Sequence, residues 1–172
     1  EQMQAAFNGG LAGTQTGAVT ISDTTGTIAA TTLTDITAQT NGTVTAAEAD
    51  ITISGTTEQV TAAIVTEETK AVMANGKVYL SDTGTVAATV LSGIGETTGG
   101  VVTVNGAMTI TGTTEQLTNA LVTEESKVIA ASANVTFTDN PTGAQLAAIN
   151  PKVGGTITLN QVAQTFTGTA EQ

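Results

Sequence analysis

The side chains that most often carry catalysis are missing from this sequence. Its 172 residues include no histidine and no cysteine, so the commonest general bases, thiolate nucleophiles and soft metal ligands are absent. The carboxylate pairs Glu67-Glu68 and Glu124-Glu125 resemble in type the two acids of a glycosidase. Each pair follows a predicted helix, however, where a solvated loop is the simpler interpretation. We therefore predict that the protein is not an enzyme.

Three aspartates are the candidate metal ligands. Asp23, Asp82 and Asp139 share one repeat position, at the end of a predicted strand, and carboxylate oxygens suit Ca²⁺. Equivalent aspartates on alternate strands would lie about 10 Å apart, which is twice the strand spacing and too far for one shared ion. An Asx-turn or a helix cap is the alternative role. We therefore predict no cofactor, with calcium as the alternative that these residues suggest.

The charge balance limits the possible partners. Fifteen acidic residues against four basic ones give a net charge of −11. A nucleic-acid partner is not expected, because phosphate binding needs a cationic surface. Membrane insertion is not expected either, because no apolar run approaches the roughly 20 residues that cross a bilayer. The acidity instead favours solubility and self-repulsion.

A nearly exact internal repeat organises the chain. The stretch "ITISGTTEQVTAAIVTEETK" at 51–70 returns as "MTITGTTEQLTNALVTEESK" at 108–127. The Glu-Gln pairs divide the sequence into periods of approximately 1–57, 58–114 and 115–172. Since the sequence begins and ends at the same phase of this period, we expect 1–172 to be a single segment of a longer repeat array.

Each period contains two similar halves, and each half predicts short strands followed by a short helix. Period-2 alternation of Thr, Val and Ile in "TVTAAEADITIS" and "VVTVNGAMTIT" is typical of strands. Thr56 or Thr57 is the expected cap of a following helix, with Glu58 in its first turn. Thr24 or Thr83 is the expected cap in the other half. The expected apolar stripes are Met3, Ala6, Phe7, Val60, Ala63, Ile64, Leu117, Ala120, Leu121, Leu33, Ile36, Leu91 and Ile94.

Such short elements are stable only when they pack against neighbours. Stacked repeats with right-handed parallel crossovers predict an α/β repeat fold. Its expected form is a right-handed β-solenoid with a short helix in each coil of about 28 residues and about six coils in all. Aliphatic side chains would fill the interior, and threonine would cover the strands outside.

Two phrases carry a resemblance to known repeats. "VTISDTTGTIAATTLTDITAQTNGTVTA" and "VYLSDTGTVAATVLSGIGETTGGVVTV", alternating with "ITGTTEQLTNAL", resemble the Thr/Ala/Gly-rich tandem repeats of giant surface or secreted proteins of bacteria, especially marine cyanobacteria. The resemblance covers nearly the whole chain. It implies an extracellular or cell-surface location and a role as an adhesin stalk, surface-layer (S-layer) component or filament. The Gly-Gly-x-Gly-x-Asp nonapeptide of calcium-binding secreted repeats is absent.

The leading prediction is an extracellular structural protein that forms a stalk, sheath, surface layer or filament. We expect it to associate with itself end to end or laterally, because uncapped sheet edges tend to pair. One alternative is an adhesion module whose face binds glycan or ice, and another is a phage-type fibre. Thr-x-Thr runs favour ice, but Ser54, Tyr79 and Leu80 interrupt the threonine rows, and a lone tyrosine argues against a glycan platform.

Overall fold

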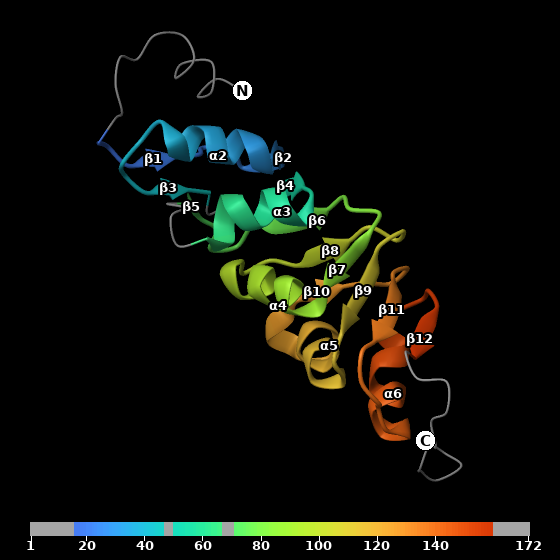
Figure 1. Ribbon diagram of the computed structural model, residues 1–172. Coiled ribbons are helices and arrows are strands. Elements are labelled where there is room, and N and C mark those ends of the chain that lie inside the picture. The colour runs from blue at the N-terminus through green and yellow to red at the C-terminus, as the bar shows by residue number, and fades with distance from the viewer. Residues whose placement is uncertain (1–15, 47–49, 67–70, 160–172) are drawn as a thin grey trace.

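The computed structural model describes residues 16–46, 50–66 and 71–159 (Figure 1). In these residues the chain forms twelve strands and five α-helices, and successive elements follow one another along the molecule from the blue end to the red end. The α-helices are α2 (Ala30–Ala38), α3 (Thr57–Val60), α4 (Ala88–Thr97), α5 (Thr114–Leu121) and α6 (Gly143–Ile149). A π-helical turn, η1 (Thr61–Val65), continues α3, and 3₁₀ turns form η2 (Glu124–Ser126) and η3 (Asn150–Lys152).

The strands make three sheets in which every pairing is parallel. They are β1 (Val19–Thr20), β2 (Thr25–Ala29), β3 (Val44–Thr45), β4 (Asp50–Gly55), β5 (Ala71–Val72), β6 (Lys77–Leu80), β7 (Thr85–Ala87), β8 (Val102–Val104), β9 (Thr109–Gly112), β10 (Val128–Ile129), β11 (Asn134–Phe137) and β12 (Ile157–Leu159). The strand orders are β1-β3-β5, β10-β8-β6-β4-β2 and β12-β11-β9-β7. Up to β6 the chain alternates between the three-stranded and five-stranded sheets, and from β6 to β11 it alternates between the five-stranded and four-stranded sheets.

The predicted right-handed β-solenoid, with one helix in each of about six coils of about 28 residues, is wrong. The structure is a mixed α/β domain with three separate parallel sheets of unequal size. Its paired strands lie between 22 residues apart, as for Val135 and Ile157, and 27 residues apart, as for Val44 and Ala71. These offsets fall short of half the sequence period. As a result β4 and β9, which carry nearly the same residues, belong to different sheets.

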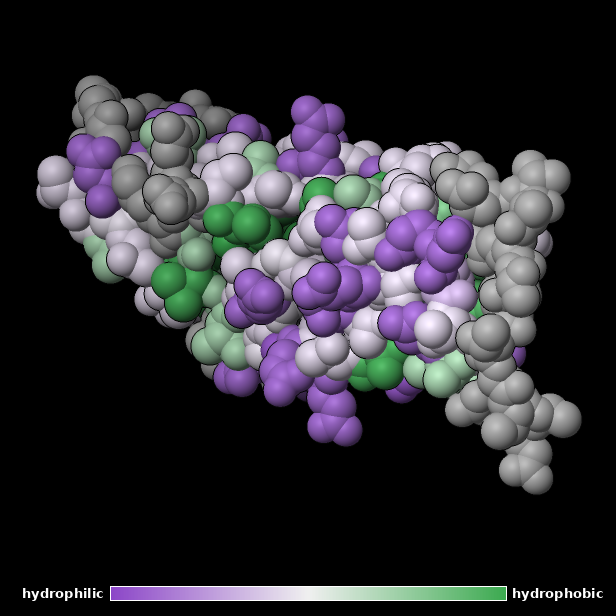
Figure 2. Space-filling model, turned by 60° about the horizontal axis from the view of Figure 1, so that its bottom comes forward, coloured by the Kyte–Doolittle hydropathy of each residue, from purple (hydrophilic) through white to green (hydrophobic). Residues whose placement is uncertain are grey.

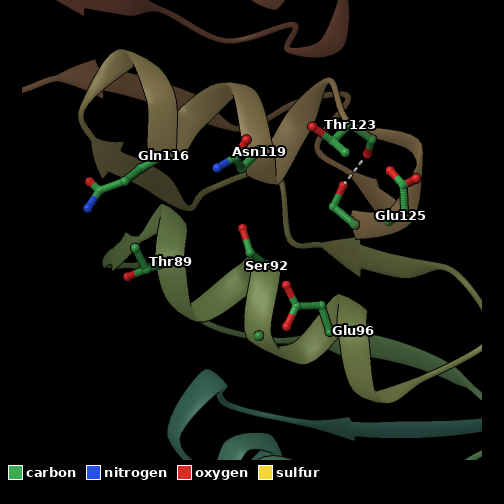
Figure 3. Close-up of a pocket in the computed structure, with 9 residues that line it drawn as sticks. Thr89, Ser92, Glu96, Gln116, Asn119, Thr123 and Glu125 are labelled. Carbon is green, nitrogen blue, oxygen red and sulfur yellow. Dashed lines mark hydrogen bonds between the residues drawn. The ribbon is translucent and has the colours of Figure 1, made fainter.

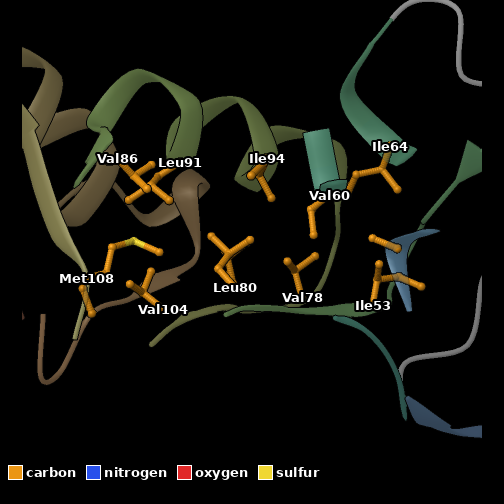
Figure 4. Packing of buried hydrophobic residues seen from close by; sticks show 14 of the residues in the cluster. Ile53, Val60, Ile64, Val78, Leu80, Val86, Leu91, Ile94, Val104 and Met108 are labelled. Carbon is orange, nitrogen blue, oxygen red and sulfur yellow. The ribbon is translucent and has the colours of Figure 1, made fainter. Parts of the chain in front are cut away.

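The core is a single layer of aliphatic side chains between the sheets and the helices. Figure 4 shows Ile53, Val78 and Leu80 on the strands facing Val60 and Ile94 on the helices. The five-stranded sheet stacks one residue from each strand in register, and this row is Ile28, Ile53, Val78, Val102 and Val128. The ten members of the predicted helical stripes that lie in the described residues are all buried, so the helix periodicity is confirmed for them. Met3, Ala6 and Phe7 lie outside the described residues.

Helix starts follow the sequence prediction in one half of the repeat and depart from it in the other. Thr56 caps α3 in a complete capping box, as predicted. Thr24 and Thr83 do not cap helices, so that prediction is wrong. The strands β2 and β7 lie between these threonines and the helices, and α2 and α4 begin directly after Ala29 and Ala87 without a side-chain cap.

Buried threonines hold the corners between successive passes of the chain. The Thr98 hydroxyl donates to the Gly76 carbonyl and accepts a hydrogen bond from the Gly100 backbone N–H at 3.2 Å. Thr40 makes an equivalent pair of bonds, because its hydroxyl donates to the Gly17 carbonyl and accepts from the Gly42 backbone N–H at 3.0 Å. A Cβ on Gly100 would lie 2.5 Å from the Gly76 carbonyl oxygen. Glycine is therefore required where one corner contacts the next through the backbone.

Candidate functional site

Two of the three candidate calcium ligands bind the N-termini of helices. Asp82 follows β6, and its Oδ2 accepts hydrogen bonds from the backbone N–H and the hydroxyl of Thr57, both at 2.6 Å. Asp139 follows β11, and its Oδ1 accepts the same two bonds from Thr114, both at 2.7 Å. Each aspartate lies 25 residues after its threonine. We call each of these pairs an Asp–Thr clasp.

The clasps place a negative charge at the N-terminus of a helix. Thr57 and Thr114 are the first residues of α3 and α5, where free N–H groups and the helix dipole favour an anion. The two threonines are only 6% and 4% exposed, so water competes little for these bonds. Each clasp joins a helix to the strand end of the next pass of the chain. The sequence suggested either a calcium ligand or a local turn or helix cap for these aspartates, and the contacts of Asp82 and Asp139 are those of a helix cap.

The three aspartates do not converge on a common metal site. Asp23 lies just before β2 and is exposed, and its carboxylate makes no hydrogen bond to any residue that the structure describes. Within 16–46, 50–66 and 71–159, no three His, Cys, Asp or Glu side chains are grouped so that they could hold a metal ion. Calcium binding therefore stays a prediction from the sequence.

A polar groove of about 320 Å³ lies between α4 and α5 (Figure 3). It is lined by Thr89, Ser92, Gly93, Glu96, Gln116, Asn119, Thr123, Glu125 and Ser126. Figure 3 shows Ser92 and Glu96 on α4 facing Asn119 on α5. The groove brings Glu125, one member of a predicted carboxylate pair, near a second acid, Glu96. The other pair, Glu67-Glu68, lies outside the described residues.

The chemistry of the groove is that of hydrogen bonding. The Ser92 hydroxyl donates to the Ala88 carbonyl at 3.2 Å, and Ser126 Oγ donates to the Thr123 carbonyl at 2.8 Å. These serines are therefore engaged with the backbone. No aromatic ring stands among the lining residues, so the groove lacks the stacking surface that sugar rings commonly use. At its end the Lys127 ammonium donates to the carbonyls of Gly95 and Glu125, at 3.2 and 3.0 Å.

The outward faces of the two larger sheets differ in chemistry. The five-stranded sheet displays Tyr79 and Ile129, which are 38% and 46% exposed, and Lys77, whose ammonium pairs with Asp50 at 3.1 Å. The four-stranded sheet displays mainly threonine. On the side of the molecule shown in Figure 2, much of the surface is pale and the green hydrophobic areas are separate patches. The molecule thus has two distinct sheet surfaces.

This separation corrects the sequence interpretation of the threonine rows. Leu80 does not interrupt an outer row, because it points into the core and is 0% exposed. Ser54 and Tyr79 do lie in an outer row, but both belong to the five-stranded sheet. The sequence could not show this, because two strands of nearly identical composition were assigned to different sheets only by the pairing offset.

The comparisons with known proteins assign no family to the chain. No protein-family model, curated protein or solved structure gives a significant match. In the described residues, no helix has both the length and the apolar character that crossing a membrane requires. The resemblance to bacterial surface repeats stays a prediction, and the contacts of this chain supply the structural evidence on function.

Proposed function

We propose that the protein is an extracellular structural repeat protein of the cell surface, which contributes to a stalk, sheath, surface layer or filament. The observation that carries this proposal is the repeated use of polar side chains to join one pass of the chain to the next. Asp82 binds Thr57 and Asp139 binds Thr114, each through one carboxylate oxygen that accepts from the threonine N–H and hydroxyl, and with the same sequence spacing. These residues stabilise the fold itself, as we expect of a protein with a structural role.

The apolar rows of the sheets support association with further copies. The middle members of these rows are buried, including Ile53 and Ile110, both 0% exposed. The members on the end strands β2 and β12, Ile28 and Ile157, are only partly buried. Among the described strands, β2 and β12 also end their sheets. Open sheet edges with apolar neighbours favour pairing with another strand.

The proposed contact is head to tail, with β12 of one copy pairing in parallel with β2 of the next. Such a contact uses two different surfaces of each copy, so it extends into a chain of molecules when it does not close into a ring. The net charge of −11 opposes the approach of two copies. Salt screens this repulsion, so added salt is expected to promote assembly.

A mixing experiment tests this contact. The Ile28→Lys variant places a charge on the inner face of β2, and Ile157→Lys does so on β12, which is how natural edge strands block pairing. Sedimentation velocity should show the wild-type chain assembling as salt and protein concentration rise, while each variant alone stays monomeric. An equimolar mixture should give dimers, because Ile28→Lys keeps an intact β12 edge and Ile157→Lys keeps an intact β2 edge.

The matched control is Thr103→Lys, which adds the same charge to the outer face of the interior strand β8 and should assemble like the wild type. Circular dichroism checks that each variant is folded. A wild-type chain that stays monomeric at every salt and protein concentration would contradict the proposed association. Folded variants that remain monomeric after mixing would contradict the head-to-tail contact.

A further inference from the structure

The outer face of the four-stranded sheet carries threonines in a two-dimensional array. We call Thr85, Thr109, Thr111, Thr136, Thr156 and Thr158 the threonine face. Thr109 pairs with Thr85 on β7, and Thr136 pairs both with Thr111 on β9 and with Thr158 on β12. Thr156 comes directly before β12 and continues its register. All six residues are exposed or partly exposed.

None of the six hydroxyls of the threonine face hydrogen-bonds to a residue that the structure describes. Helical threonines behave differently, since Thr34 and Thr118 donate to backbone carbonyls one turn earlier, at 3.1 and 2.8 Å. Threonine is branched at Cβ and therefore has few χ1 rotamers. The face thus presents preorganised hydroxyl and methyl groups to whatever lies outside it.

The two outer rows of this sheet hold no charged residue although the protein is strongly acidic, and acids approach the threonine face at its β7 edge, where Thr85 lines a hollow with Glu58 and Asp82. The chain carries 15 acidic and four basic residues, yet the two outer rows contain none of them. The remaining positions of these rows are Ala87 and Asn134, and Asn134 Oδ1 accepts a hydrogen bond from the Thr156 backbone N–H at 2.8 Å. An uncharged surface of this kind matches an uncharged ligand.

The spacing of the array points to a ligand that is itself periodic. Neighbouring strands lie about 4.8 Å apart, and residues i and i+2 on one strand lie about 6.7 Å apart. This grid resembles the repeat of oxygen atoms on a face of hexagonal ice. A protein partner would instead be expected to meet an aromatic or arginine anchor, and these two rows hold neither.

We propose that the threonine face binds ice. Its hydroxyls order water in the positions of the ice lattice, and its methyl groups occupy the spaces between them. This role goes beyond the structural function and does not depend on it, because it uses the outer face of one sheet and not the sheet edges. The uneven rows of the five-stranded sheet, with Tyr79 and Ile129, take no part in it.

Ice-affinity partitioning of the full chain tests the proposal, with thermal hysteresis as a second readout. The wild-type protein should enter the growing ice above the level of a non-binding protein of similar size and charge. The Thr136→Lys variant should lower this partitioning about tenfold, the effect of losing one good anchor. Thr111→Lys serves as a second variant at a neighbouring site, and circular dichroism confirms that each variant is folded.

The matched control is Thr103→Lys, which adds the same charge at a partly exposed threonine on the outer face of the other large sheet. It should partition into ice like the wild type. The proposal is overturned if the wild-type protein stays in the liquid. It is also overturned if Thr103→Lys and Thr136→Lys lower the partitioning into ice by equal amounts. Binding to crystalline cellulose or chitin instead of ice would also overturn the proposal, provided that Thr136→Lys abolishes this binding and so places it on the threonine face.

Discussion

At the scale of single residues, the carboxylates of Asp82 and Asp139 cap helices that lie 25 residues earlier in the sequence. A helix normally receives its cap from the residue just before it, and Thr56 supplies one to α3. Asp82 adds two more acceptor contacts to the same helix end. The short helix α3 is thereby tied to the strand end after β6, and its stability depends on a residue far along the sequence.

Removing a clasp should destabilise the fold measurably. Asp82→Ala leaves the buried Thr57 donors without their acceptor, and we expect it to lower the free energy of unfolding by about 1–3 kcal/mol. Asp139→Ala should behave alike, and the exposed Asp23→Ala should change little. Urea denaturation measures all three variants.

A double-mutant cycle with Thr57→Val isolates the hydroxyl bond of the clasp, because valine keeps the backbone N–H that also donates to Asp82. We expect a coupling energy between Asp82 and Thr57 of about 0.5–3 kcal/mol, the range for residues that touch. A coupling near zero would show that the hydroxyl bond does not stabilise the fold, and a loss at Asp23 as large as at Asp82 would show the same of the whole clasp.

At the scale of elements, nearly identical sequences form different helices. "TEQVTAAIV" at 57–65 gives four α-helical residues and then a π-helical turn, whereas "TEQLTNALV" at 114–122 gives a regular helix over Thr114–Leu121. The Thr118 hydroxyl donates to the Thr114 carbonyl at 2.8 Å, while the equivalent Thr61 hydroxyl is buried and has no hydrogen-bond partner in the part of the chain that the structure describes. The local sequence predicted both helices and their caps, but the neighbours of each helix determined its backbone.

Helix α4 offers a test of how closely the elements pack. A Cβ on Gly95 would lie 2.0 Å from the Ser126 carbonyl oxygen, whereas the nearest atom to a Cβ on Gly93 is a Val65 methyl carbon at 4.0 Å. Gly95→Ala should cost about 1–3 kcal/mol because the backbone must move. Gly93→Ala should stabilise by about 0.5–1 kcal/mol, since alanine favours a helix.

Thermal or urea unfolding of the two glycine variants decides between these effects. Equal changes at both positions would mean that helix propensity alone governs α4 and that its contact with η2 is loose. This contact is invisible in the sequence, where Gly93 and Gly95 differ only in their place on the helix.

At the scale of the whole molecule, the sequence predicted parallel strands, short helices and an aliphatic core, but not how the strands are divided among sheets. The helical stripes and the aliphatic interior followed from the local pattern, as Leu33, Leu91 and Leu117 illustrate. The strands β2 and β7 did not, because they lie where the pattern predicted helix starts. The division into three sheets did not follow, because it depends on pairing offsets such as that between Val78 and Val102. These offsets are shorter than half the repeat, so successive copies fall in different sheets.

The candidate site shows the same limit. Asp82 and Asp139 were identified from the sequence as special positions, and a helix cap was one of their two predicted roles. Their partners, Thr57 and Thr114, could be assigned only when the chain returned to the same place 25 residues later. The groove between α4 and α5 could not be predicted from the sequence, since each polar side chain that lines it is ordinary for its position in the chain.

Immunogold electron microscopy of cells that produce the protein tests the structural role most directly. An antibody against the protein should decorate a regular extended structure outside the cell envelope, such as a filament, sheath or lattice, at periodic spacing. Label confined to the cytoplasm, or scattered outside the cell as single molecules without any regular structure, would contradict the proposal that this protein builds an extracellular assembly.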